Sequence, residues 1–303
     1  MRNEFTEAIN LIGKNDKKVI FLTGDLGFNA FEPLKKSFKS RFINAGVAEQ
    51  NMIGVAAGLA KKGYKVFCYS IAPFIVYRCL EQIRNDVCFH RLPVYIVGNG
   101  GGFGYGIMGS SHHAISDLAC ISSLGSIKSW IPCFKNDVRN IVTNIYEENR
   151  PAYLRLGRSN TEFISKNKSG SFSIVKQALS DITIIALGSI VEEVLIASDQ
   201  LKVSKAINIL SCINSPVIFE GQSLEIIKKS RRIIVVEDHV KIGGISQQIS
   251  YLITAKKLNI KEFISLNAKL YPSETYGDQL FHHKESGIDI EGIKAAIEQM
   301  FSI

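Results

Sequence analysis

The chain has 303 residues, of which 46% are hydrophobic and 21% charged, and its formal net charge is +8. This composition excludes a disordered or low-complexity chain, and the length suggests two domains that each bury a core. The charged N-terminus lacks the apolar stretch of a signal peptide, and the six cysteines form no Cys-x-x-Cys motif. These features favour a reduced, cytoplasmic protein.

Basic residues occur in short groups along the chain, as at Lys35-Lys36, Lys61-Lys62 and Lys228–Arg232, and no base-stacking motif accompanies them. We interpret the groups as a solvated face and predict no nucleic-acid partner. The most apolar stretch, residues 92–127, is interrupted by glycines, two histidines and an aspartate, so it predicts no membrane span.

Strand-length apolar runs alternate with helical patterns in the first half of the chain, which is typical of a parallel sheet covered by helices on both faces. The predicted strands are Lys18–Thr23, Lys65–Tyr69, Pro93–Val97, Ile127–Ile131 and Ala152–Leu156. The predicted helices are Ala48–Lys62, Val76–Phe89, Ile115–Leu124 and Asp137–Glu148.

A polar stretch from Gly157 to Ser173 interrupts this alternation and is interpreted as a linker. A second series follows, with strands at Ile182–Leu187, Ala206–Leu210 and Arg232–Val236 and helices at Ile190–Leu201, Leu224–Lys229 and Gly243–Leu252. The pattern predicts an α/β fold of two doubly wound domains, residues 1–160 and 172–303, joined by a linker at 161–171.

The loop from Gly98 to Gly109 is dominated by glycine and contains a G-x-G-x-x-G match. A dinucleotide site also needs an acidic residue about 20 positions further on, and none occurs between Asp117 and Asp137. The loop therefore does not predict a nicotinamide site. So many glycines favour close approach of the backbone to a ligand.

His112 and His113 end this loop, and no third histidine or cysteine lies nearby, so they predict no metal site. A histidine at the tip of a glycine loop is well placed to donate a hydrogen bond to a substrate oxygen. The alternative is that the pair merely decorates the surface.

Glu49 lies in the first turn of a predicted helix made of small apolar residues. A carboxylate there stabilises the helix dipole, which is the simplest reason for its presence. In so apolar a segment, however, a carboxylate is costly unless it is paired, and no partner lies within a helical turn in the sequence.

Several segments resemble the pyrimidine-binding and C-terminal domains of the transketolase family, which includes deoxyxylulose-phosphate synthase. They are Gly46–Gln50 (GVAEQ), Glu81–Asp86 (EQIRND), Ser111–Ala119 (SHHAISDLA), Arg155–Asn160 (RLGRSN) and Val236–Gly244 (VEDHVKIGG). The similarity covers nearly the whole chain in the family's order. It implies a pyrimidine-binding domain followed by a transketolase C-terminal domain.

The resemblance implies that Glu49 bonds the aminopyrimidine ring of thiamine diphosphate and favours its imino form, so that the cofactor supplies the partner that the sequence lacks. Phe74 and Tyr77 are equal candidates for the ring that stacks on the pyrimidine, with packing in the core as the alternative. Asp25 matches an acidic residue beside the cofactor, although Gly24-Asp25 is also ordinary turn chemistry.

The resemblance also implies that His112 is a catalytic residue together with Glu49, and we predict His112 and His113 as substrate-binding residues. Arg158 and Arg2 match arginines that bind a sugar phosphate. The implied reaction is transfer of a two-carbon ketol unit between sugar or sugar-phosphate substrates.

Two departures from the family pattern matter. The family's Gly-Glu-Asp-Gly reads GIMG at Gly106–Gly109, so we expect a different substrate or different groups to hold it. The Gly-Asp-Gly motif of the domain that holds magnesium and diphosphate is absent from the sequence. We therefore predict the C-terminal subunit of a split transketolase, with Mg²⁺ held mainly by a partner N-terminal subunit in a heterotetramer.

Two other functions remain open from the sequence. The β subunit of a thiamine-dependent 2-oxoacid dehydrogenase has the same two domains and a similar length. A non-catalytic partner subunit is suggested by Ile107 and Met108, which replace the family's two acidic residues.

Overall fold

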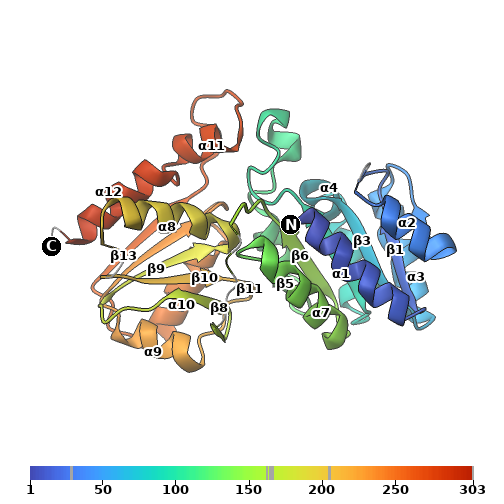
Figure 1. Ribbon diagram of the computed structural model, residues 1–303, viewed down its shortest axis with the longest axis horizontal. Coiled ribbons are helices and arrows are strands. Elements are labelled where there is room, and N and C mark those ends of the chain that lie inside the picture. The colour runs from blue at the N-terminus through green and yellow to red at the C-terminus, as the bar shows by residue number, and fades with distance from the viewer. Residues whose placement is uncertain (28–29, 162, 164–166, 204–205, 302–303) are drawn as a thin grey trace.

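Two β-sheets organise the chain, and the computed structural model describes residues 1–27, 30–161, 163, 167–203 and 206–301. Figure 1 shows the two sheets side by side, the first built mainly from the blue-to-green half of the chain and the second from the yellow-to-red half. The N-terminus lies near the boundary between the halves, and the C-terminus lies at the far end of the second.

The first sheet has seven strands in the order β11-β5-β6-β4-β3-β1-β2. Its strands are β1 Val19–Thr23, β2 Phe42–Asn44, β3 Lys65–Ile71, β4 Val94–Asn99, β5 Lys128–Trp130, β6 Ala152–Leu156 and β11 Asn214–Ser215. All of them pair in parallel except β11, which runs antiparallel to β5. The strands β1, β3, β4 and β6 are almost wholly buried, which is why the sequence shows them as continuous apolar runs.

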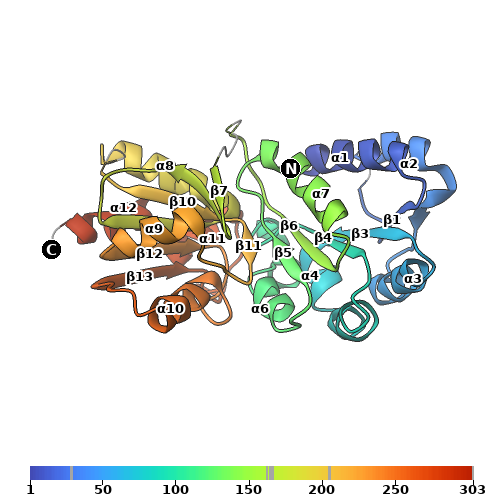
Figure 2. The ribbon, with the colours of Figure 1, turned by 90° about the horizontal axis from the view of Figure 1, so that it is seen from below.

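Helices cover both faces of the first sheet (Figure 2). One face packs against α1 Arg2–Asn15, α2 Glu32–Phe38 and α7 Val138–Glu148. The other face packs against α3 Glu49–Lys61, α4 Ala72–Val76, the π-helical turn Ile83–Cys88 and α6 Asp117–Ser122. The short helix α5 Leu80–Gln82 leads into the π-helical turn. Single 3₁₀ turns occur at Lys39–Arg41, Gly106–Met108, Ser110–His112, Lys135–Asp137 and Gly188–Ile190.

The helix predicted at Val76–Phe89 is wrong in its bounds. It begins at Ala72 because Pro73 is favoured in the first turn of a helix, where its missing N–H has no partner to lose. The helix α4 ends at Val76, and a turn at residues 77–79 separates it from α5 and the π-helical turn. The predicted single helix is therefore divided into three short segments.

The second sheet has six strands in the order β13-β12-β9-β10-β8-β7. They are β7 Asn167–Ser169, β8 Phe172–Lys176, β9 Ile182–Leu187, β10 Asn208–Cys212, β12 Arg232–Glu237 and β13 Glu262–Asn267. The last four are parallel, whereas β7 and β8 form an antiparallel edge. The α/β fold is therefore confirmed, but each sheet is mixed rather than purely parallel.

Helices also cover both faces of the second sheet. One face packs against α8 Val191–Gln200 and α12 Ile290–Phe301, and the other against α9 Gly221–Lys229 and α10 Ile245–Ala255. The remaining helix, α11 Gln279–Ser286, lies beside the glycine loop of the first half, and both rise above the boundary in Figure 1.

The two halves share more than the predicted linker at 161–171. The strand β7 begins inside that range, and residues 162 and 164–166 of the range lie outside the described residues. The strand β11 crosses back to extend the first sheet, and one apolar cluster runs through both halves. No helix among the described residues is long and apolar enough to span a bilayer.

Candidate active site

The carboxyl ends of the parallel strands of the first sheet lie at one edge, which is where open α/β sheets bind ligands. Five of the predicted site residues follow these strand ends: Asp25 after β1, Glu49 after β2, Phe74 after β3, His112 after β4 and Arg158 after β6. Parallel pairing thus gathers side chains that are far apart in the sequence.

Glu49 is the first residue of α3 and only 1% exposed. Ser70 Oγ donates to its Oε1 at 3.0 Å, and Arg78 Nη1 donates to its Oε2 at 2.7 Å. The sequence showed no partner for Glu49 within a helical turn, but the chain itself supplies two from more distant positions, so the expectation that this partner is lacking is wrong. Its partners come from the end of β3 and the turn after α4, and they offset the cost of burying the charge.

Arg78 also contacts the aromatic ring of Phe74. The guanidinium carbon lies 4.5 Å from the centroid of the ring, a distance typical of a cation–π contact. The ring of Phe74 also lies edge-on to the imidazole of His112, at 5.0 Å between centroids. Glu49, Arg78, Phe74 and His112 thus form one continuous row of contacts at the sheet edge.

Tyr77 has a different environment from Phe74. Its hydroxyl oxygen accepts from both the backbone N–H and the hydroxyl of Ser116, each at 3.0 Å, and burial raises its pKa. The ring packs against the core of the first half. The structure thus gives Tyr77 a role in joining α4 to the start of α6, which favours Phe74 as the ring that faces a ligand.

The two adjacent histidines differ in exposure and in hydrogen-bond partners. His112 is half-buried, and its Nδ1 lies 3.0 Å from Ser111 Oγ. His113 is 2% exposed, its Nε2 lies 2.7 Å from the carbonyl of Gly106, and its Nδ1 lies 3.0 Å from Tyr271 Oη. Both nitrogens of His113 are therefore engaged within the chain, and burial lowers its pKa. The substrate-binding role of both histidines stays a prediction, and His112 is the more accessible of the two.

Asp25 has a left-handed backbone, with φ at 57°, and an exposed side chain. Its Oδ1 accepts from Asn44 Nδ2 at 2.8 Å, and its N–H donates to Asn44 Oδ1 at 3.1 Å, so it ties together the ends of β1 and β2. It follows Gly24, where an added Cβ would lie 3.3 Å from Glu49 Oε1. Asp25 therefore lies beside the Glu49 site without contacting that carboxylate.

Arg2 and Arg158 line one cavity of about 520 Å³ within the first half. Arg2 comes from α1 and Arg158 follows β6, so residues far apart in the sequence share this cavity. Tyr105, Asn99 and the backbone of the glycine loop complete its wall. A second cavity of about 330 Å³ shares Arg158 and reaches the second half, where acidic side chains line it.

The glycine loop packs against the chain itself. Gly102, with φ at 65°, has no room for a Cβ because the carboxylate of Asp238 fills that space. At Gly106 a Cβ would lie 2.8 Å from the backbone of Asp278. The expectation that these glycines serve a ligand is wrong for these positions, since they allow the second half to approach.

Two residues of the site were not predicted from the sequence: Arg78 and Ser70. Ser70 directly follows the predicted strand Lys65–Tyr69, and Arg78 lies four residues after Phe74, so the position of each in the sequence could have indicated it. Ile107 and Met108, which replace the family's acidic pair, are 73% and 54% exposed. The described residues contain no group of three or more His, Cys, Asp or Glu side chains suited to a metal.

Comparison with known proteins matches both halves of the chain to family models. Residues 1–163 match the transketolase pyrimidine-binding domain, and residues 170–272 match the transketolase C-terminal domain. The chain is 36% identical to a Methanocaldococcus jannaschii protein described as a proposed transketolase C-terminal section, over 99% of this chain and 96% of that one. It is 29% identical to one of the subunits of the apulose-4-phosphate transketolase of Phocaeicola vulgatus, over 98% and 96%.

Solved structures show the same arrangement. A split-gene transketolase, described as an inactive β4 tetramer, superposes with a TM-score of 0.83 at 27% identity and covers 98% of this chain and 96% of its own. The transketolase of Campylobacter jejuni superposes with a TM-score of 0.77 at 16% identity, which shows the fold alone. The chain spans 46% of that longer protein.

Proposed function

The chain belongs to the transketolase family, and from that premise we propose that it is the C-terminal subunit of a two-chain, thiamine-diphosphate-dependent transketolase. It would transfer a two-carbon ketol unit between sugar or sugar-phosphate substrates. The named relatives of the same length support this role, since one is called a C-terminal section and another is named as one subunit of a transketolase.

The observation that carries this proposal is the buried carboxylate of Glu49 and the half-buried ring of Phe74 at the carboxyl edge of the sheet, both of which contact Arg78. Such a pair fits an aminopyrimidine, which needs an acceptor in its plane and an apolar surface for its face. Glu49 would bond the ring and Phe74 would stack on it, with Asp25 nearby. When bound, thiamine diphosphate supplies the nucleophilic carbon that carries the ketol unit.

His112, next to Phe74, would donate a hydrogen bond to a substrate oxygen and steady the charge that develops there. Arg2 and Arg158 would bind the substrate phosphate in the cavity that they share. A partner chain would hold Mg²⁺ and the diphosphate, and the two chains would assemble as a heterotetramer. The β-only tetramer of the split-gene relative is described as inactive, which supports the need for a partner.

The test uses the complex of this chain with its diphosphate-binding partner, with a product assay for ketol transfer. Glu49→Gln should lower kcat by at least about 100-fold, because the amide keeps the shape but loses the charged acceptor. The control Glu81→Gln removes an exposed carboxylate and should leave kcat unchanged. Normal turnover of Glu49→Gln, or full activity of the chain alone, would refute the proposal, and release of carbon dioxide would indicate 2-oxoacid decarboxylation instead.

A further inference from the structure

Arg78 makes the same two contacts that the proposed site would offer to an aminopyrimidine. Its Nη1 donates to Glu49 Oε2 at 2.7 Å, and its guanidinium lies over the ring of Phe74 at 4.5 Å. The first contact satisfies a carboxylate that is 1% exposed, and the second covers a half-buried aromatic face. The side chain of Arg78 therefore occupies both groups that would recognise the ring, the carboxylate of Glu49 and the face of Phe74.

The chemistry of the guanidinium explains this occupancy. It is flat and delocalised, it presents N–H groups on a planar N–C–N unit, and it stacks on aromatic rings. An aminopyrimidine that bonds a carboxylate through a ring nitrogen is likewise flat, with a donor in its plane and a face that can stack on an aromatic ring. Because a buried carboxylate without a donor is costly, a chain without cofactor is stabilised when Arg78 supplies one.

Arg78 can also leave the site. Its side chain is 43% exposed, in contrast to Glu49, so rotation of its long stem would return the guanidinium to water at little cost in solvation. Ser70 would remain as the donor to the other oxygen, Glu49 Oε1. The exchange thus affects only the Oε2 position and the face of Phe74.

We propose that Arg78 is an internal stand-in for the cofactor's aminopyrimidine ring: it neutralises Glu49 and covers Phe74 until thiamine diphosphate displaces it. This inference rests on the proposed function, because it takes Glu49 and Phe74 as the pyrimidine site. It follows that Arg78 stabilises the free chain and competes with the cofactor. A residue that helped to bind the cofactor would have the opposite effect on affinity.

The first experiment measures the dissociation constant of thiamine diphosphate, with excess Mg²⁺, by titration calorimetry of the complex with the partner chain. Arg78→Met removes the competing guanidinium and should tighten binding about tenfold, the equivalent of one charge-assisted hydrogen bond. Arg78→Lys keeps the charge but not the planar fork and should fall between Met and wild type. The control Arg84→Met removes an exposed arginine paired with Glu81 and should leave the affinity unchanged. Unchanged or weaker binding by Arg78→Met would overturn the inference.

The second experiment measures the melting temperature of the full chain without cofactor or partner. Arg78→Met should lower it by about 2–4 °C, because Glu49 is left buried without its charged donor. In the Glu49→Gln background the same substitution should have almost no effect, and additive losses would overturn the inference. If Glu49→Gln left both cofactor affinity and turnover unchanged, the proposed function itself would fail. Weaker cofactor binding by Arg78→Met would overturn only the inference about Arg78.

Discussion

Phe74 and Tyr77 lie three residues apart around the end of α4, yet their surroundings differ in kind. The ring of Phe74 meets Arg78 and His112, whereas Tyr77 uses its hydroxyl to hold Ser116. An aromatic ring that stacks on a ligand must keep one face available, and a ring anchored by its polar tip in the core does not meet that need.

This difference yields a prediction for the two residues. Phe74→Ala should weaken thiamine diphosphate binding to the assembled complex by about tenfold, because the stacking surface is lost. Tyr77→Phe should leave the affinity unchanged but cost about 1 kcal/mol of stability, because the Ser116 donors lose their acceptor. Calorimetric titration and chemical denaturation measure the two effects, and the reverse pattern would assign the stacking role to Tyr77.

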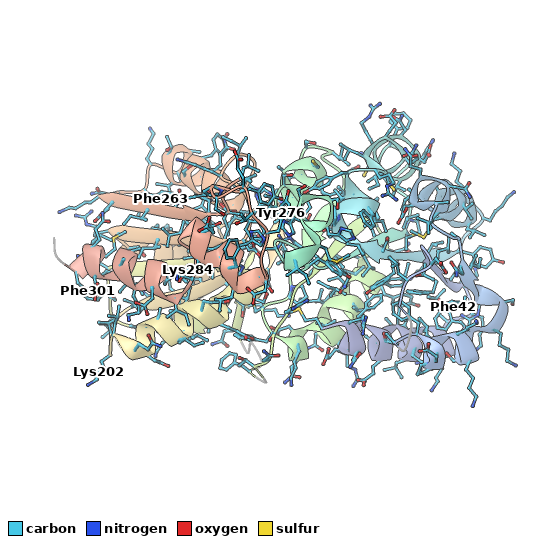
Figure 3. All side chains as sticks on the ribbon, turned by 90° about the horizontal axis from the view of Figure 1, so that it is seen from above. Phe42, Lys202, Phe263, Tyr276, Lys284 and Phe301 are labelled. Atoms are coloured by element: carbon cyan, nitrogen blue, oxygen red, sulfur yellow. The ribbon has the colours of Figure 1, made fainter. Side chains whose placement is uncertain are left out.

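The glycine loop between β4 and α6 is an element whose conformation depends on the second half of the chain. The backbone N–H of Phe103 donates to the carboxylate of Asp238, and the space beside Gly102 is filled by the same carboxylate. Figure 3 labels Tyr276 at this boundary, where its hydroxyl donates to Ser110 Oγ at 3.3 Å. The loop that presents His112 is therefore held by contacts from the second half.

Alanine substitutions at two glycines separate the effect of the Asp238 contact on stability from the effect of backbone strain. Gly102→Ala and Gly125→Ala both place a Cβ on a left-handed residue, with φ at 65° and 75°, but only the first meets other atoms. Gly102→Ala should therefore lose about 1–3 kcal/mol more stability than Gly125→Ala, as expected for overpacking. Urea denaturation of both variants measures the difference in the free energy of unfolding. Equal losses would show that the close approach of Asp238 to Gly102 does not affect stability.

At the scale of the whole molecule, buried charges join the two halves. Arg155 is paired with Asp117 at 2.9 Å, and its Nη2 donates to the backbone carbonyl of Asp238 at 2.9 Å. His283 of α11 lies 3.3 Å from the carboxylate of Asp238 and 3.7 Å from that of Glu193. Burial alone would lower the pKa of His283, but these two carboxylates raise it to about 10.

The raised pKa predicts how stability depends on pH. His283 is charged in the folded chain up to about pH 10 but only to about pH 6.5 in the unfolded chain, so its contribution is complete below pH 6.5 and is lost as the pH rises toward 10. His283→Gln should cost about 3–5 kcal/mol near pH 6 and progressively less at higher pH. Denaturation of both proteins from pH 6 to 10 measures this, with exposed His90→Gln as the control. A loss that does not change with pH would contradict the assignment.

Local patterning explains why much of the fold could be predicted. β6 and β9 match their predicted bounds because buried parallel strands appear as continuous apolar runs. α3 differs from its predicted bounds by one residue at each end. β11 has only two residues, and two residues carry no period, so its return to the first sheet could not be predicted. The antiparallel edge of β7 and β8 was missed because it lies at the polar stretch interpreted as a linker.

By itself, the sequence determined the alternation of strands and helices, the two-part organisation and the unusual position of Glu49 in an apolar helix start, since each depends on neighbours along the chain. Only the tertiary structure decided that Arg78, 29 residues away, pairs with Glu49, that the guanidinium of Arg78 lies over the ring of Phe74, and that the second half packs on the glycine loop. The physical reason is that parallel pairing brings distant strand ends to one edge, where distance and burial, rather than spacing in the sequence, select the partners of a charge.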